Sequence, residues 1–162
     1  AELIWFLRGD TSIEYLLKND CNIWTGDAYQ SYLKECKRME KNNKHLHSDG
    51  RPYTKEEFVE KIKTDKSFSK RFGNLGKIYG YQWRNWNGEI DQIQNLINEL
   101  ITNPDSRRMV VSAWAVHDLP KMVLPPCHYG FQVYTRELSL EERLQVWNTK
   151  FGFANEEQKN TI

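Results

Sequence analysis

Apolar residues recur with a helical period in separate stretches of this chain. The clearest stretch is 90–101, where apolar side chains at i, i+3, i+4, i+7 and i+8 share one helix face. These positions are Ile93, Leu96, Ile97, Leu100 and Ile101. Asn103-Pro104-Asp105 should end this helix, and Gly9 should end a second apolar helix over 2–7.

Three capping signatures predict further helix starts. A Ser or Thr followed three residues later by Glu satisfies free backbone N–H groups at a helix N-terminus. The pairs are Thr11 with Glu14, Thr54 with Glu57, and Ser139 with Glu142. Strands are predicted over 109–114 and 131–134, where β-branched and aromatic residues concentrate. Helical segments outnumber these two strands, so the pattern predicts an α+β fold.

Residues 25–70 differ from the rest in being rich in Lys, Glu, Asn and Asp. We interpret them as a mostly helical surface insertion. The basic run 34–44 is interleaved with acidic residues and asparagines, which is typical of a solvated helix face.

Composition limits the classes of function. The 162 residues are enough for one domain, and a net charge of +1 argues against a general nucleic-acid binder. No apolar run is long enough to span a bilayer. Three widely spaced cysteines do not form a disulfide framework, so we expect a reducing, cytoplasmic location. The chain opens without methionine inside a helical pattern, and we expect it to be part of a longer protein.

Cys127 is the first candidate for chemistry. Pro125 and Pro126 fix the backbone before it, and a rigid approach helps to present a nucleophile. A reactive thiolate needs nearby positive charge, which Arg107 and Arg108 could supply as an anion-binding pair. The commoner fates are a buried structural cysteine and a solvated arginine pair, and both alternatives stay open.

Two weaker candidates remain. Glu2 lies among apolar neighbours, where a carboxylate needs a partner and could serve acid–base chemistry, although an exposed helix end is the simpler interpretation. Cys21, Cys36, His45 and His47 could be imagined as a zinc set, but their spacing fits none of the usual ligand pairs, so we predict no metal.

Four blocks of this sequence, taken together, resemble the thymidylate synthases. They are ELIWFLRGDT at 2–11, LGKIYGYQWR at 75–84, NPDSRRM at 103–109 and LPPCH at 124–128. Ser112-Ala113-Trp114 and Phe131-Gln132 also fit, so the resemblance covers 2–134 apart from 25–70. It implies a thymidylate-synthase-type fold, in which a mixed sheet packs against helices and which is incomplete in this chain.

The resemblance also implies a function: a homodimeric transferase that methylates deoxyuridylate to thymidylate. Methylenetetrahydrofolate would be the cosubstrate, giving both carbon and hydride, without a metal. Cys127 would add to C6 of the pyrimidine, and His128 would lie beside it. Glu2 would assist proton movements through ordered water, and Tyr79 would assist proton removal at C5.

Binding roles follow from the same resemblance. Arg107 and Arg108 would cross the dimer to the nucleotide phosphate held by the other subunit. Trp24 would form part of the wall facing the folate. DNA and membrane are not expected partners.

This sequence departs from the family at several points. Ala115 stands where asparagine is expected, and Asn74 stands where aspartate is common. From about 137 the chain enters an apparent second insertion, and the family's later Gln-Arg-Ser block does not occur in it. We therefore expect the 162-residue chain to be inactive by itself. A pyrimidine-nucleotide hydroxymethylase and a non-catalytic interaction module remain as alternative functions.

Overall fold

The computed structural model describes residues 1–42, 50–153 and 155–159. Its helical elements are α1 (Glu2–Leu7), α2 (Ile13–Lys18), α3 (Thr25–Glu40), α4 (Lys55–Thr64), α5 (Lys66–Phe72), α6 (Tyr79–Asn85), α7 (Gln92–Thr102), the 3₁₀ helix η1 (Val116–Lys121), α8 (Leu140–Phe151) and α9 (Glu156–Lys159). The strands are β1 (Val110–Ser112) and β2 (Gly130–Gln132). The predicted α+β class is confirmed, with helices dominating.

The two predicted strands are confirmed, and each is three residues long. Strands β1 and β2 pair antiparallel, with Val111 opposite Phe131, and no other strand joins them within the described residues. The described residues form this one antiparallel pair, and the larger mixed sheet that the resemblance implies stays a prediction. The side-chain amide of Gln92 on α7 bonds the backbone N–H and C=O of Ser112, so it occupies the free edge of β1.

The core is continuous from α1 to the helices of the 25–70 segment. Trp5 on α1 and Ile13 and Leu16 on α2 are fully buried, while Tyr32 on α3 and Phe58 on α4 pack ring against ring at 5.2 Å. The segment 25–70 therefore contributes an aromatic group of its own to the core. Its exposed side carries Lys34, Lys37 and Arg38, as predicted for a solvated helix face. Its interpretation as an insertion stays a prediction.

One predicted cap is wrong. Ser12, not Thr11, caps α2, and its hydroxyl accepts from the N–H of Glu14. The C=O of Thr11 accepts from the N–H of Leu75, so Thr11 is held in extended backbone contact with the 74–75 segment. The carboxylate of Glu14 instead accepts from Ser69 and pairs with Lys18. The other two predicted capping boxes, at Thr54 and Ser139, are confirmed.

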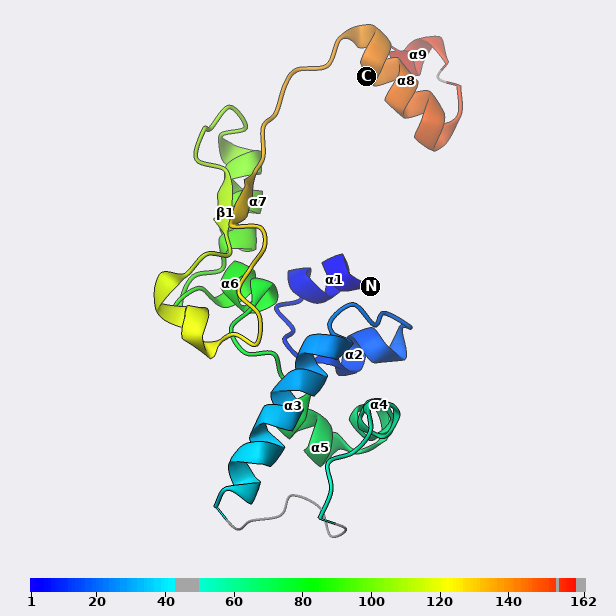
Figure 1. The fold of residues 1–162 in the computed structure, drawn as a ribbon. Coiled ribbons are helices and arrows are strands. Elements are labelled where there is room, and N and C mark those ends of the chain that lie inside the picture. Colours follow the sequence, from blue (N-terminus) through cyan, green and yellow to red (C-terminus); the bar gives the residue numbers. More distant parts are fainter. Residues whose placement is uncertain (43–49, 154, 160–162) are drawn as a thin grey trace.

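The C-terminal helices are separated from the rest of the fold. Figure 1 shows α8 and α9 beyond an extended segment, apart from the other helices.

Helix α7 follows its predicted range closely, but Ile97 is 41% exposed and Ile101 is 75% exposed. Its apolar stripe is therefore only partly covered by the described residues. No helix among those residues is long and apolar enough to cross a membrane.

Candidate functional site

A cavity of about 510 Å³ opens between α1, the start of α3, α6 and the loop from η1 to β2. It is lined by Glu2, Phe6, Ile23, Trp24, Asp27, Tyr79, Trp83, Leu124, Pro125, Cys127, His128, Gly130 and Phe131. Five residues singled out in the sequence meet here from four separate segments. They are Glu2, Trp24, Tyr79, Cys127 and His128.

Glu2 lies in the first turn of α1, and its partner is Trp24. The indole Nε1–H of Trp24 donates to the Glu2 carboxylate at 2.6 Å. Trp24 is the N-cap residue of α3 and is almost fully buried. The bond therefore joins α1 to α3. It gives the Glu2 carboxylate a hydrogen-bond donor that its apolar neighbours in the sequence cannot provide.

Tyr79 joins α6 to the cysteine loop. It is the first residue of α6, and its hydroxyl accepts from the backbone N–H of His128 at 3.1 Å. Pro126 is buried, whereas Cys127 and His128 are exposed at the cavity. The buried Pro126 thus anchors the loop, and the Cys127 thiol remains accessible. All three cysteines are free thiols.

Aromatic rings form much of the cavity wall. Phe6 lies 4.8 Å from the ring of Tyr79 and 5.4 Å from that of Trp83, while Trp83 meets Phe131 edge-on at 5.2 Å. Such a wall suits a flat ligand. Sequence reasoning did not single out Phe6 or Trp83. Each lies four residues after a chosen residue on the same helix, Glu2 and Tyr79, so the i, i+4 spacing could have found them.

Charge within the cavity is negative. Glu2 and Asp27 line it, and no Lys or Arg does in the described part of the chain. A bound phosphate would therefore have to find its cations elsewhere.

Arg107 and Arg108 lie outside this cavity. They precede β1, their side chains are exposed, and neither guanidinium pairs with a carboxylate among the described residues. Arg108 lines a separate groove of about 400 Å³ between α7 and β1. Neither arginine lines the cavity that contains Cys127, so the expectation that the pair supplies positive charge to that thiol stays a prediction.

The imagined zinc set is only partly described. Cys36 is buried and Cys21 is half-buried, while His45 and His47 lie outside the described residues. Across residues 1–42, 50–153 and 155–159, no cluster of potential ligands could hold a metal ion.

Most of this chain matches known proteins of one family. The family model described as thymidylate synthase matches residues 1–149. Similar curated proteins include thymidylate synthases of Mycoplasma genitalium, 43% identical over 143 residues, and Listeria monocytogenes, 43% identical over 157 residues. These matches cover 88% and 89% of this chain but 45% and 50% of the relatives. The chain spans about half the length of the curated relatives that it matches.

Proposed function

We propose, because the chain belongs to the thymidylate synthase family, that it carries the nucleophile of an enzyme that methylates deoxyuridylate to thymidylate. The observation that supports this proposal best is the meeting of Cys127, Tyr79, His128, Glu2 and Trp24 around one cavity. Residues from four segments gather there, and a vestigial pocket has no physical need to keep all five.

The cavity suits the ligands that this reaction requires. Its aromatic wall fits the flat pyrimidine and pterin rings, and Trp24, proposed for the wall facing the folate, lines it next to Ile23. Methylenetetrahydrofolate would supply the one-carbon unit and the hydride, so no metal is required.

The exposed Cys127 thiol would begin the reaction. Its sulfur forms a bond to C6 of deoxyuridylate, which moves the electron pair of the C5–C6 double bond to C5 and makes C5 a nucleophile. Tyr79 would assist the later removal of the C5 proton, and Glu2 would hold ordered water for proton movements. C5 would form its new bond to the one-carbon unit of methylenetetrahydrofolate, and after loss of the C5 proton that carbon would separate from the folate nitrogen. Hydride from the folate would then reach this carbon, and the C–S bond would break with its electron pair leaving on sulfur, so that Cys127 returns to its thiolate.

The arginine pair would act in a homodimer. The cavity lining offers a phosphate no cation, whereas Arg107 and Arg108 have charged groups without a partner among the described residues. In a two-fold dimer these arginines could reach the phosphate bound by the other subunit. We place the enzyme in the cytoplasm. We also infer that β1 and β2 belong to a larger mixed sheet, with insertions at about 25–70 and from about 137.

The first test is intact mass spectrometry of the gene product with 5-fluorodeoxyuridylate and methylenetetrahydrofolate. We expect a covalent adduct on the Cys127 peptide that disappears in Cys127→Ala but persists in Cys21→Ala, the matched control outside the cavity. The 162-residue chain by itself should form no adduct. A folded gene product that gives none would refute the enzyme proposal.

The second test mixes two inactive variants. Cys127→Ala lacks the nucleophile, and the double variant Arg107→Ala, Arg108→Ala lacks the crossing cations. If each site uses both subunits, random mixing should restore about a quarter of the wild-type activity, since half of the dimers contain one intact site. Activity that stays absent after subunit exchange would exclude the crossing.

A further inference from the structure

A buried carboxylate behind the cavity has no place in the chemistry described so far. Asp118 lies on η1, is fully buried, and does not line the cavity. Its oxygens face four side chains: Lys121 at 2.9 Å, Lys77 at 3.1 Å, Gln82 at 3.2 Å and His117 at 3.3 Å. Burying a charge is costly unless it is paired, so this concentration of donors must hold Asp118 in place.

The electrostatics agree with the geometry. Burial by itself raises the pKa of Asp118, but hydrogen bonds from Lys121, Gln82 and Lys77 outweigh it and hold the pKa well below its usual range. Asp118 is therefore ionised wherever the protein is folded near neutral pH.

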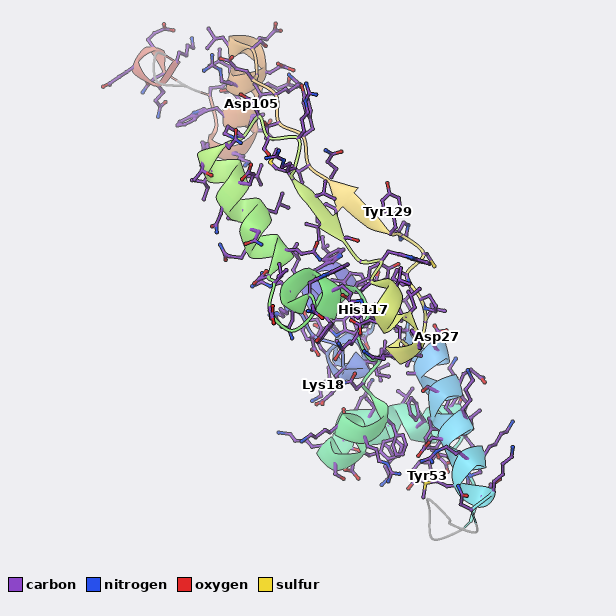
Figure 2. The ribbon with its side chains drawn as sticks, turned by 90° about the vertical axis from the view of Figure 1, so that its left-hand side faces the viewer. Lys18, Asp27, Tyr53, Asp105, His117 and Tyr129 are labelled. Carbon is purple, nitrogen blue, oxygen red and sulfur yellow. The ribbon has the colours of Figure 1, made fainter. Side chains whose placement is uncertain are left out.

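The donors belong to two segments of the chain. Lys121 and His117 share η1 with Asp118. Gln82 lies on α6, the helix that begins at Tyr79, and Lys77 lies just before this helix. Figure 2 shows His117 on η1, the yellow turn beside α6. Gln82 also donates to the C=O of Lys77 at 2.9 Å, which fixes the entry into α6. Asp118 thus links η1 to the first turns of α6.

Backbone contacts reinforce this link between the two segments. Gly76 forms an isolated bridge with Met122, and the N–H of Val123 donates to the C=O of Leu75 at 3.0 Å. The chain then runs from Val123 directly into the loop that carries Cys127. Displacing η1 from α6 would therefore displace Cys127 from Tyr79, whose hydroxyl meets the backbone of His128.

We propose that Asp118 is a positioning residue that holds the Cys127 loop at a fixed distance from Tyr79 through Lys77 and Gln82. It touches no substrate. The catalytic part of this proposal rests on the proposed function, because it requires Cys127 and Tyr79 to serve successive steps of one reaction.

The experiment compares three variants of the full gene product. Asp118→Asn keeps the shape and removes the charge, and Lys77→Met removes one donor from a partly exposed position. Glu57→Gln is the matched control. It also removes the charge of a paired carboxylate, but Glu57 is on α4, where it pairs with Arg51 at 2.8 Å. Two readouts are used: amide hydrogen exchange, which needs no activity, and the rates of two chemical steps.

Exchange separates positioning from general stability. In Asp118→Asn the His128 amide should lose at least about tenfold of its protection, because its bond to Tyr79 loosens, while the Phe58 amide in α4 changes less than about twofold. Lys77→Met should show the same pattern more weakly, and Glu57→Gln should leave His128 unchanged. Equal acceleration at both amides, or no change at His128, would overturn the proposal.

The chemical steps test the same spacing. The rate of Cys127 addition is measured as the rate of adduct formation with 5-fluorodeoxyuridylate. The rate of proton removal is measured as tritium release from deoxyuridylate labelled at C5. Asp118→Asn should slow tritium release at least about tenfold more than adduct formation, since a merely unfolded fraction would lower both rates equally. Equal slowing would refute the positioning role. A wild-type protein that forms no adduct would refute the proposed function instead, and hydrogen exchange would then decide the structural link alone.

Discussion

Replacing Gly76 by alanine should destabilise the protein far more than the same change at Gly88. Both glycines have left-handed backbone, with φ of +80° at Gly76 and +82° at Gly88. Their surroundings differ, because a Cβ at Gly76 would lie 2.0 Å from the C=O oxygen of Lys121, whereas a Cβ at Gly88 would meet nothing within 4 Å. The pair therefore separates backbone conformation from steric contact.

The magnitude follows from these two terms. A left-handed alanine costs about 1–2 kcal/mol, which is the whole effect expected for Gly88→Ala. At Gly76 the backbone of Lys121 must also move by more than about 1 Å to reach ordinary contact, and overpacking of this kind costs about 1–3 kcal/mol more. The hydrogen bond from Val123 to Leu75 would loosen, which adds about 1 kcal/mol. We expect about 3–6 kcal/mol in total, a large share of the stability of a typical domain.

The assay is urea unfolding of each variant, followed by far-ultraviolet circular dichroism and tryptophan fluorescence. A shifted midpoint with an unchanged slope would report stability alone. If Gly76→Ala and Gly88→Ala differ by less than about 0.5 kcal/mol, the close approach of the two segments is not tight, and the reasoning fails.

Three further predictions concern the helical part of the molecule. Ser12→Ala should lower the free energy of unfolding by about 1 kcal/mol, while Thr11→Ala changes it by less than about 0.5 kcal/mol; equal losses in urea titrations would reject Ser12 as the cap. Phe58→Ala should cost about 3–5 kcal/mol, because a fully buried ring leaves a cavity, and a thermal midpoint like that of the wild type would contradict this. The hydrogen bonds from Arg51 lower the pKa of Glu57 to about 2 from its usual 4.5. The stability that Glu57 adds is thus fully present above pH 4.5 and is lost as the pH falls toward 2. The difference in unfolding free energy between wild type and Glu57→Gln should therefore shrink over that range. A constant difference would count against the pairing of Glu57 with Arg51.

Local features of the fold were readable from the sequence because short-range contacts cause them. The capping boxes at Thr54 and Ser139 involve residues three apart, and the apolar period around Ile93 predicted α7 within two residues at its start. The cap at Thr11 failed because a distant residue, Leu75, already binds its backbone. Only tertiary structure decides such a competition.

The site divides in the same way. The sequence by itself singled out Cys127 through its two prolines and Glu2 through its apolar neighbours, and the family resemblance added Tyr79 and Trp24. Nothing local indicates that these residues meet. Their meeting depends on long-range contacts such as the bond from Trp24 to Glu2, which spans 22 residues.

Asp118 is the clearest case that only the tertiary structure decided. In the sequence it is one acidic residue in a largely apolar stretch, and its partner Lys77 lies 41 residues away. Its burial, its ionised state and its link to the Cys127 loop all arise when η1 packs against α6. A charge becomes structurally decisive only where the fold removes it from water and brings its partners within hydrogen-bonding distance, and that information lies in the packing rather than in any local pattern.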